Sequence, residues 1–427
     1  MHEPVHGQTI SGDKALSEIK VNLENAWRIQ SPGTKNWRKG VRPGDTPKYF
    51  MVSVDTHLSP PPRLYVERIA PEYRERLPRV AVRDGKKYLV QEGCRPEPLA
   101  DPVLEGEDLV RSKAGAAILA ATMNSDDKVG LSRIADQERD GVDAEVIFPN
   151  GAALLMWGSK DSRFVHAQCQ IWNNWAIEVC RPHLDRCKPT AALAPADLDA
   201  SVGEVKRVAK LGFDALVLPT KPIWGPHDIT DVNYNLSHFD PLWSAIQDHN
   251  LTICFHVATG KDPRCARGNG GAIVNYVVHS NAPTLEPIVN MCAAGVFERF
   301  PRLKAGTIEA NAGWLPWMLD AMDEAYKKHH FWVRPKLKAL PSEYFRLNCF
   351  ASIAEDRSAL MLAEPYNLTG NLMWGNDYPH HEGTWPHSAE AIERTFGDHL
   401  SETGRSKILG LNAARVFGFE IPQKYRA

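Results

Sequence analysis

The segment Val54-Asp55-Thr56-His57 ends an apolar, strand-length run with an aspartate and a histidine two residues apart. Side chains i and i+2 of a β-strand point to the same face, so Asp55 and His57 project together. Three further polar motifs end other apolar runs: Phe255-His256, Ile308-Glu309 and Trp374-Gly375-Asn376-Asp377-Tyr378-Pro379-His380. Carboxylates and imidazoles at strand ends, more than 300 residues apart, are what a barrel needs to gather a metal ion at one mouth.

Eight apolar segments of strand length follow one another along the chain, at 50–56, 142–148, 190–194, 213–218, 251–256, 303–308, 345–350 and 371–376. Stretches with helical spacing lie between most of them, at 164–179, 198–211, 241–249, 283–297 and 315–326. This alternation predicts parallel strands in an α/β fold, either an open doubly wound sheet or a closed (β/α)8 TIM barrel. We predict the barrel, because only a ring brings the polar ends of strands one, five, six and eight to one place.

The remaining segments define the predicted domain organisation. Residues 1–50 are polar and contain Trp27 and Trp37, which predicts an N-terminal arm that docks on another surface. The barrel is predicted over 51–420, with a large insertion at 63–130 after the first strand that is long enough to cap the mouth. Residues 421–427 form a C-terminal tail.

The charge balance restricts the class of partner. The 427 residues contain 50 Lys and Arg against 52 Asp and Glu, so no net field draws the chain to nucleic acid or to an anionic membrane. We therefore expect a small molecule as the partner. The start Met1-His2-Glu3-Pro4 lacks the features of a signal peptide, and eight scattered cysteines form no Cys-x-x-Cys pair, so a cytoplasmic protein with reduced cysteines is expected.

Each candidate site residue also has a structural alternative. His256, at the end of a buried strand, is either a metal ligand or a core histidine whose hydrogen bonds are satisfied. An aspartate in the position of Asp55 commonly caps a turn. The Glu309 carboxylate needs a cation, a hydrogen-bond donor or water, because burying an unpaired carboxylate costs several kcal/mol. Its structural alternative is to cap the N-terminus of a helix. Asp377 and His380 open a loop rich in ionisable and aromatic residues, of which His381 is expected to be solvated surface.

Two other polar residues end predicted strands. Lys221 follows strand four. It has three alternative roles: a carbamylated lysine that bridges metals, a partner of a substrate carboxylate, or a solvated charge. Asn348 on strand seven either points into the mouth or bonds neighbouring backbone.

From about residue 50 to the C-terminus, the chain resembles the amidohydrolase-related family, the second amidohydrolase group. The matching stretches are Val54-Asp55-Thr56-His57, Arg139-Asp140-Gly141-Val142-Asp143, Phe300-Pro301-Arg302-Leu303-Lys304, Ala312-Gly313-Trp314-Leu315-Pro316, Gly375-Asn376-Asp377-Tyr378-Pro379-His380 and Ile408-Leu409-Gly410-Leu411-Asn412-Ala413-Ala414-Arg415-Val416-Phe417. The resemblance implies a metal-dependent (β/α)8 barrel with the ligands Asp55, His57, His256 and Asp377. It also implies reactions such as non-oxidative decarboxylation, hydrolysis or, in a minority of members, dioxygen activation at two metal ions.

Two departures from the commoner family pattern bear on the metal. The first motif is Asp-x-His where His-x-His is usual, and Glu309 stands where many relatives carry a histidine. Oxygen donors at both positions favour manganese or iron(II) over a zinc site built of histidines. If Glu309 and His380 also bind, three carboxylates and three imidazoles are available and two ions fit; with four ligands, one ion binds and Glu309 serves in acid–base chemistry.

The leading hypothesis is a metal-dependent enzyme that hydrolyses or decarboxylates a small carboxylate or carbonyl substrate. It would use one or two ions of manganese, iron or zinc, with Asp377, Glu309 and His380 as catalytic residues. A dinuclear iron or iron–manganese oxygenase that hydroxylates a C–H bond is the main alternative. A third hypothesis is a structural subunit of a related catalytic chain, in a homo- or hetero-oligomer assembled through the arm.

Overall fold

The structure is a computed structural model that describes residues 40–61, 63–93, 96–98, 131–154, 156–222, 232–259, 266, 268–329, 335–380 and 382–425. Trp27, Trp37 and His381, about which the sequence made predictions, lie outside the described residues, as does much of the predicted insertion.

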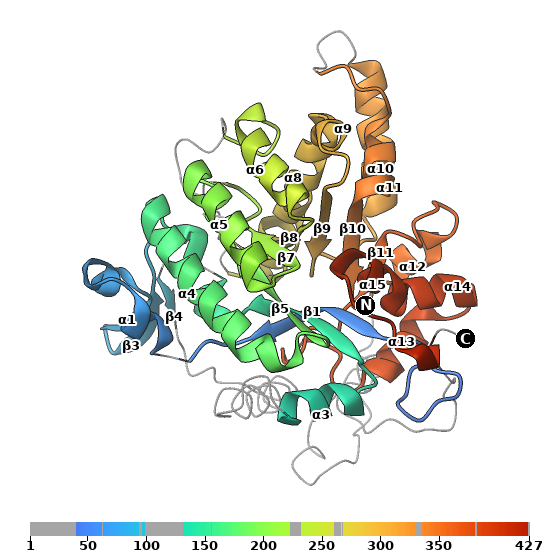
Figure 1. Cartoon of the computed structure of the whole chain (residues 1–427), viewed down its shortest axis with the longest axis horizontal. Helices are drawn as coiled ribbons and strands as arrows, with labels where there is room; N and C mark the ends of the chain where they lie inside the picture. Colours follow the sequence, from blue (N-terminus) through green and yellow to red (C-terminus); the bar gives the residue numbers. More distant parts are fainter. Residues whose placement is uncertain are drawn as a thin grey trace, which may run out of the picture.

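Eight parallel strands form the central sheet (Figure 1). They pair in the order in which they occur along the chain: β1 (Val52–Leu58), β5 (Ala144–Pro149), β6 (Cys187–Ala192), β7 (Ala215–Leu218), β8 (Thr252–His256), β9 (Lys304–Ile308), β10 (Cys349–Ile353) and β11 (Leu372–Trp374). Every strand is buried along almost its whole length, as expected for a sheet covered by crossover helices. The predicted (β/α)8 barrel is confirmed.

The ring closes between the first and last strands, immediately beyond the end of β11. The Asp377 N–H donates to the Asp55 carbonyl at 2.9 Å, and the His57 N–H donates to the Tyr378 carbonyl at 2.7 Å. Gly375 permits this approach, since a Cβ on residue 375 would lie 2.6 Å from the Cβ of Asp55. The backbone contacts that complete the barrel are therefore made by candidate site residues and their neighbours.

Helices pack around the sheet (Figure 1). In chain order they are α4 (Ser162–Cys180), α5 (Leu198–Leu211), α6 (Asp240–Asp248), α8 (Ala282–Ala293), α9 (Val296–Arg299), α10 (Leu315–Lys328), α11 (Pro341–Asn348), α12 (Arg357–Ala363), α13 (Ser388–Phe396), α14 (Glu402–Ser406) and α15 (Asn412–Phe417). Local signals set their ends: Asp197 caps the N-terminus of α5, and Gly212, at φ 99°, ends it in the left-handed conformation. No helix in the described ranges is both long enough and apolar enough to cross a membrane.

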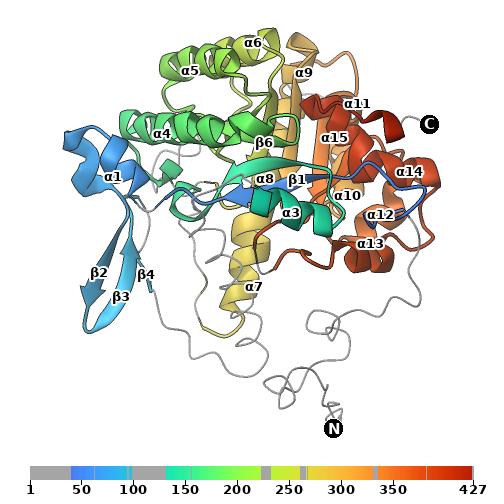
Figure 2. The same ribbon diagram turned by 60° about the horizontal axis from the view of Figure 1, so that its bottom comes forward.

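Two elements project from the barrel in Figure 2. The described part of the insertion contains α1 (Leu64–Arg68), the 3-10 helix η2 (Pro71–Arg76) and an antiparallel sheet of β2 (Arg79–Arg83), β3 (Lys86–Val90) and β4 (Glu97–Pro98). Asp84 and Gly85 both have positive φ at the β2–β3 turn, as an Asp-Gly hairpin requires. The second projection is α7 (Gly271–Tyr276), which continues into the π-helical turn η7 (Val277–Asn281).

The predicted position of strand seven was wrong. Residues 345–348 end helix α11, and the strand begins at Cys349. Asn348 therefore lies before β10 and not in the mouth; its amide donates to the carbonyls of Pro301 and Leu303 at 2.9 and 2.8 Å. Of the two roles predicted for Asn348, the structure shows the second, hydrogen bonding to neighbouring backbone.

Helix α3 (Leu131–Arg139) precedes β5 and contributes a buried ion pair behind the mouth. The Arg133 guanidinium binds both carboxylate oxygens of Glu145 at 2.7 and 2.9 Å, and both side chains are 2 % exposed. Arg133 also donates to the main-chain carbonyl of His57 at 2.9 Å. The pair thus connects α3, β5 and the ligand-bearing end of β1.

Replacing Arg133 by alanine should lower the free energy of unfolding by about 3–5 kcal/mol, because it leaves the Glu145 carboxylate buried without a counter-charge. Urea unfolding followed by circular dichroism measures the loss. Arg63→Ala, which breaks an exposed pair with Glu67, is the control and should change stability by less than about 0.5 kcal/mol. Equal effects of the two substitutions would contradict the structural importance of the buried pair.

Candidate metal centre

The structure brings all six predicted site residues together at the carboxyl ends of the strands. Two overlapping groups have donor atoms within 4.8 Å of one another: Asp55, His57, His256 and Glu309 in the first, and His57, Asp377 and His380 in the second. Asp55 and Asp377 are each 4 % exposed, and His57 and His256 are fully buried. Their convergence is what the strand-end positions predicted.

The spacing of the donor atoms fits the ligand shell of one ion. The Nε2 atom of His256 lies 3.2 Å from Asp55 Oδ1 and 3.4 Å from Glu309 Oε2. His57 Nε2 lies 3.6 Å from Asp55 Oδ1 and 3.3 Å from Asp377 Oδ1. Ligands bound at about 2.1 Å are separated by about 3.0 Å in octahedral and about 3.4 Å in tetrahedral geometry. These side chains are therefore arranged as they would be around a metal.

Backbone carbonyls orient the two buried histidines. His57 Nδ1 lies 3.0 Å from the Pro149 carbonyl, and His256 Nδ1 lies 2.8 Å from the Val257 carbonyl. Because a carbonyl only accepts, each Nδ1 carries the proton and each Nε2 presents its lone pair to the site, as in metal-bound histidines. His57 Nε2 is buried and has no hydrogen-bond partner in the structure, which indicates that a further group belongs there.

Burial and like charge set the electrostatics of the site. Burial, together with the neighbouring His380 and His256, holds the pKa of His57 well below its usual value, so this imidazole is neutral. Burial also raises the pKa of Glu309 well above its usual value, and the charges of Asp377, Asp55 and Glu382 add to the effect. A cation at the centre would relieve this accumulation of negative charge.

The backbone of two candidate residues is strained. Glu309 has φ 61° and Asp377 has φ 55°, in the left-handed region that non-glycine residues rarely adopt. Hydrogen bonds hold both in place, since the Glu309 N–H donates to Ser352 Oγ at 2.9 Å and the Asp377 N–H makes the barrel-closing bond to Asp55. Such strain is concentrated at functional sites.

The sequence model of the amidohydrolase family matches residues 54–419. The chain belongs to the amidohydrolase family. This confirms the resemblance that the sequence motifs indicated, and the match covers the barrel from within β1 to beyond α15.

Solved structures of similar fold include several decarboxylases. The 5-carboxyvanillate decarboxylase of Sphingomonas paucimobilis is 21 % identical, with a TM-score of 0.58 over 87 % of this chain and 100 % of that one. A dihydroxybenzoic acid decarboxylase of Polaromonas sp. JS666, with bound manganese and the inhibitor 2-nitroresorcinol, is 17 % identical, with a TM-score of 0.57 over 88 % and 99 %. An amidohydrolase of Mycobacterium avium subsp. paratuberculosis has a TM-score of 0.64 at 17 % identity, over 87 % and 99 %. At these identities the similarity concerns the fold.

His380 of this amidohydrolase has a partner at each ring nitrogen, and one of the two partners, Asn150, lies outside the set of candidate ligands. Nδ1 lies 2.8 Å from Asp377 Oδ1, and Nε2 lies 3.0 Å from Asn150 Oδ1. Burial opposes a charge on this ring, but the hydrogen bond to Asp377 and the surrounding carboxylates outweigh it and raise its pKa to about 9. In this conformation His380 supports Asp377 and offers no free nitrogen to an ion.

Sequence reasoning missed three residues near the centre. Asn150 directly follows β5, so the strand-end signal that identified the other residues could have found it. Glu382 lies in the polar loop after Asp377 and acts on the charges of Glu309 and His380. Burial and then Glu309 raise the pKa of Tyr276 on α7, which places this phenol near the mouth; no sequence signal indicated it.

Lys221 was predicted to be a carbamylated bridge, a substrate partner or a solvated charge. In the structure its Nζ lies 3.1 Å from Glu286 Oε2 on helix α8, and its side chain is 23 % exposed. The partner in this ion pair, Glu286, belongs to neither group of candidate ligands.

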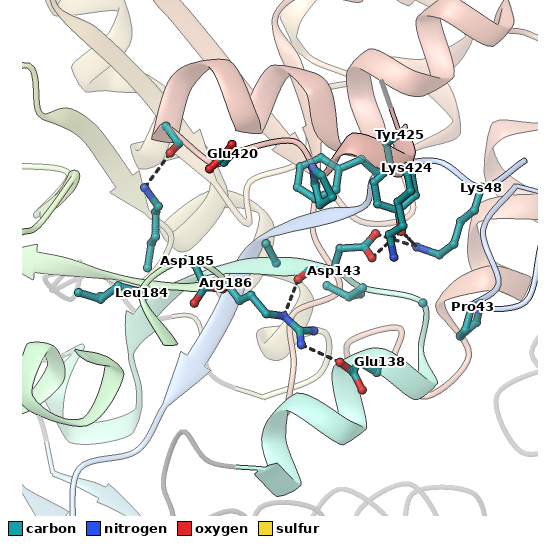
Figure 3. A pocket seen from close by; sticks show the side chains of 17 residues that line it. Pro43, Lys48, Glu138, Asp143, Leu184, Asp185, Arg186, Glu420, Lys424 and Tyr425 are labelled. Carbon is teal, nitrogen blue, oxygen red and sulfur yellow. Dashed lines mark hydrogen bonds and ion pairs between the residues drawn. The ribbon is translucent and has the colours of Figure 1, made fainter. Parts of the chain in front are cut away.

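A cavity of about 770 Å³ lies at the opposite end of the barrel, near the start of β1, β5 and β6 (Figure 3). Four of its charged side chains form two ion pairs: Lys48 pairs with Asp143 at 2.7 Å, and Arg186 with Glu138 at 2.6 Å. The Tyr425 hydroxyl donates to Asp143 at 2.7 Å and holds the C-terminal segment there. We assign this end of the amidohydrolase barrel to stability, because these pairs join the starts of the strands to α3 and to the C-terminal segment.

Gly375→Ala should weaken metal binding, because the added methyl would meet the Cβ of Asp55 at 2.6 Å and displace this carboxylate. The overpacking should also lower stability by about 1–3 kcal/mol. Titration of the metal-free protein with Mn²⁺, together with urea unfolding, measures both effects. Gly370→Ala, whose added Cβ meets nothing within 4 Å, is the matched control, and equal Mn²⁺ affinities of the two variants would refute the role assigned to Gly375.

Proposed function

We propose that this chain is a metal-dependent decarboxylase of small aromatic carboxylic acids. The observation that carries the proposal is the buried group Asp55, His57, His256 and Glu309, whose donor atoms have the spacing of a ligand shell and include the orphaned His57 Nε2. Membership of the amidohydrolase family and the decarboxylases among structures of similar fold support this reaction class.

We propose Asp55, His57, His256 and Asp377 as the ligands of one ion. Asp377 belongs to the second donor group and joins the first through His57, whose Nε2 lies 3.3 Å from Asp377 Oδ1, whereas Glu309 of the first group is assigned to acid–base chemistry below. A donor set with two carboxylates favours Mn²⁺ or Fe²⁺ over Zn²⁺, and bound manganese in the Polaromonas decarboxylase supports Mn²⁺. A second ion is disfavoured because both groups of donors share the single free nitrogen of His57, and because His380 is engaged by Asp377 and Asn150. The predicted ligand role of His380 is therefore replaced in this proposal by support of Asp377.

Glu309 is proposed as the proton donor. When bound, the metal supplies a Lewis acid for the substrate oxygens. The bond between the ring carbon and the carboxylate breaks, its electron pair stays on the ring carbon, and carbon dioxide leaves. Glu309 then gives its proton to that carbon and regains one from solvent. Burial raises the pKa of Glu309 well above its usual value, which favours the protonated form that a general acid needs.

Hydrolysis of a carbonyl compound would use the same residues, with Asp377 accepting a proton from water. The expected dinuclear oxygenase and the expected structural subunit have no supporting observation in the described part of the chain or in the structures compared above. Product analysis separates these reactions, since only decarboxylation releases carbon dioxide without consuming oxygen.

The Mn²⁺-loaded protein should release carbon dioxide from at least one member of a panel of hydroxybenzoates that includes 2,6-dihydroxybenzoate and 5-carboxyvanillate. Glu309→Gln keeps the size of the side chain but removes the proton, so kcat should fall by about 10²–10⁴-fold. Glu138→Gln, at the far end of the barrel, is the control and should leave kcat unchanged. Release of no carbon dioxide by the metal-loaded protein, or consumption of oxygen with the panel, would sink the decarboxylase assignment.

The affinity for Mn²⁺ should increase with pH. Burial raises the pKa of Glu309 above 4.5, and a cation bound beside this carboxyl favours its ionised form, so metal binds more tightly once Glu309 has lost its proton. The pKa of His57 is held well below its usual value, so His57 adds no competing proton near neutral pH. Isothermal titration of the metal-free protein at several pH values measures the trend, which Glu309→Gln should reduce. An affinity independent of pH would contradict the protonated state of Glu309.

A further inference from the structure

We propose that Asn150 is a positioning residue for the metal centre: it holds the His380 ring, and through it the Asp377 carboxylate, in the orientation needed for metal binding. This inference rests on the proposed metal centre and adds to it a residue that contacts neither the ion nor the substrate.

A chain of hydrogen bonds connects the ends of three barrel strands. Asn150 Nδ2 donates to Ser59 Oγ at 3.0 Å, just beyond β1. Asn150 Oδ1 lies 3.0 Å from His380 Nε2, and His380 Nδ1 lies 2.8 Å from Asp377 Oδ1, both beyond β11. Asn150 is the link from β5, and it fixes the relative positions of the first and last strand ends.

The amide orientation of Asn150 follows from a neighbouring backbone group. The Gly151 N–H donates to Asn150 Oδ1 at 2.7 Å, and a backbone N–H cannot accept, so the atom that faces it is the oxygen. An amide oxygen accepts only, and therefore His380 must present an N–H at Nε2. The imidazole is held at both nitrogens, which fixes its ring plane and the direction of Nδ1 toward Asp377.

Two consecutive residues at the end of β5 thus orient two imidazoles. The Pro149 carbonyl binds His57 Nδ1 at 3.0 Å, and Asn150 binds His380, whose ring stacks on His57 with centroids 4.1 Å apart. The Oδ1 atom of Asp377, which is bonded to His380 Nδ1, also lies 3.3 Å from His57 Nε2. A strand that supplies no proposed ligand therefore positions two of them, His57 directly and Asp377 through His380.

Removing the acceptor should release His380 and let the Asp377 carboxylate turn out of the ligand shell. Outer partners of metal ligands typically contribute 10–100-fold to metal affinity, so Asn150→Leu should weaken Mn²⁺ binding by about that factor. Asn150→Asp keeps an oxygen for Gly151 and His380 and adds negative charge. It should bind Mn²⁺ at least as tightly as the wild type, because the polar contact is restored.

The experiment titrates metal-free wild type and variants with Mn²⁺ and follows the free aquo ion by electron paramagnetic resonance, with the thermal midpoint measured in parallel. The control is Asn173→Leu, which removes another buried amide, on helix α4, that bonds both the N–H and the carbonyl of Ala192 and belongs to neither group of candidate ligands. The control should lower the thermal midpoint without changing the Mn²⁺ affinity. Asn150→Leu should change the affinity, and Asn150→Asp should restore it.

Equal Mn²⁺ affinity in wild type and Asn150→Leu would overturn the positioning role, as would a loss in Asn150→Asp as large as in Asn150→Leu. If Asn150→Leu does not fold, Asn150→Ala removes the same acceptor and is judged by the same criteria. Absence of Mn²⁺ binding in the wild type would instead refute the metal centre itself, and this inference with it. The two failures are therefore distinguishable by the wild-type titration alone.

Discussion

The contact between the first and last strands is the constraint on which the barrel and its candidate site both depend. Two backbone hydrogen bonds close the ring, from Asp377 to Asp55 and from His57 to Tyr378. The residues that make these bonds are candidate ligands or their immediate neighbours, so the chain cannot complete the barrel without gathering the donor atoms. This explains how side chains separated by 322 positions in sequence reach the separations of a ligand shell, and why residue 375 has to be glycine.

The site carries an electrostatic cost that the rest of the fold compensates. Asp55, Asp377 and Glu309 lie close together, and burial with like charge raises the pKa of Glu309. The left-handed backbone of Glu309 and Asp377 adds strain, which Ser352 and the ring closure restrain. Behind these residues, α3 supplies buried polar partners: Asn376 donates to Gln137 and Asp140 at 3.2 and 3.1 Å, and Arg133 binds the His57 carbonyl. Backbone strain and like charge are therefore concentrated in the mouth, whereas the residues around it have satisfied hydrogen bonds. This distribution is typical of a functional site.

Sequence periodicity was sufficient for the barrel and for the convergence of the six candidates, because strand ends in a ring share one edge. It failed where tertiary contacts decide. Residues 345–348 are apolar enough to resemble a strand, but Pro341 starts a helix whose inward face buries Phe345. The Asp84-Gly85 pair is by itself a recognisable signal for the hairpin turn that the structure has there. The role of Asn150 could not be predicted, because it depends on the approach of His380 from 230 positions away.

The two ends of the barrel differ in how their charges are satisfied, and this difference localises function. At the far end, Lys48, Arg186 and Lys188 each bind a carboxylate at 2.6–2.7 Å, so the cavity there needs no ligand for charge balance. At the mouth, Asp377 binds His380, whereas Asp55 and Glu309 face His57 and His256, and a buried nitrogen of His57 has no hydrogen-bond partner. Unpaired burial of this kind costs several kcal/mol and persists only where something else supplies the missing partner. A divalent cation satisfies the carboxylates and the free nitrogen together, whereas a proton satisfies one atom at a time.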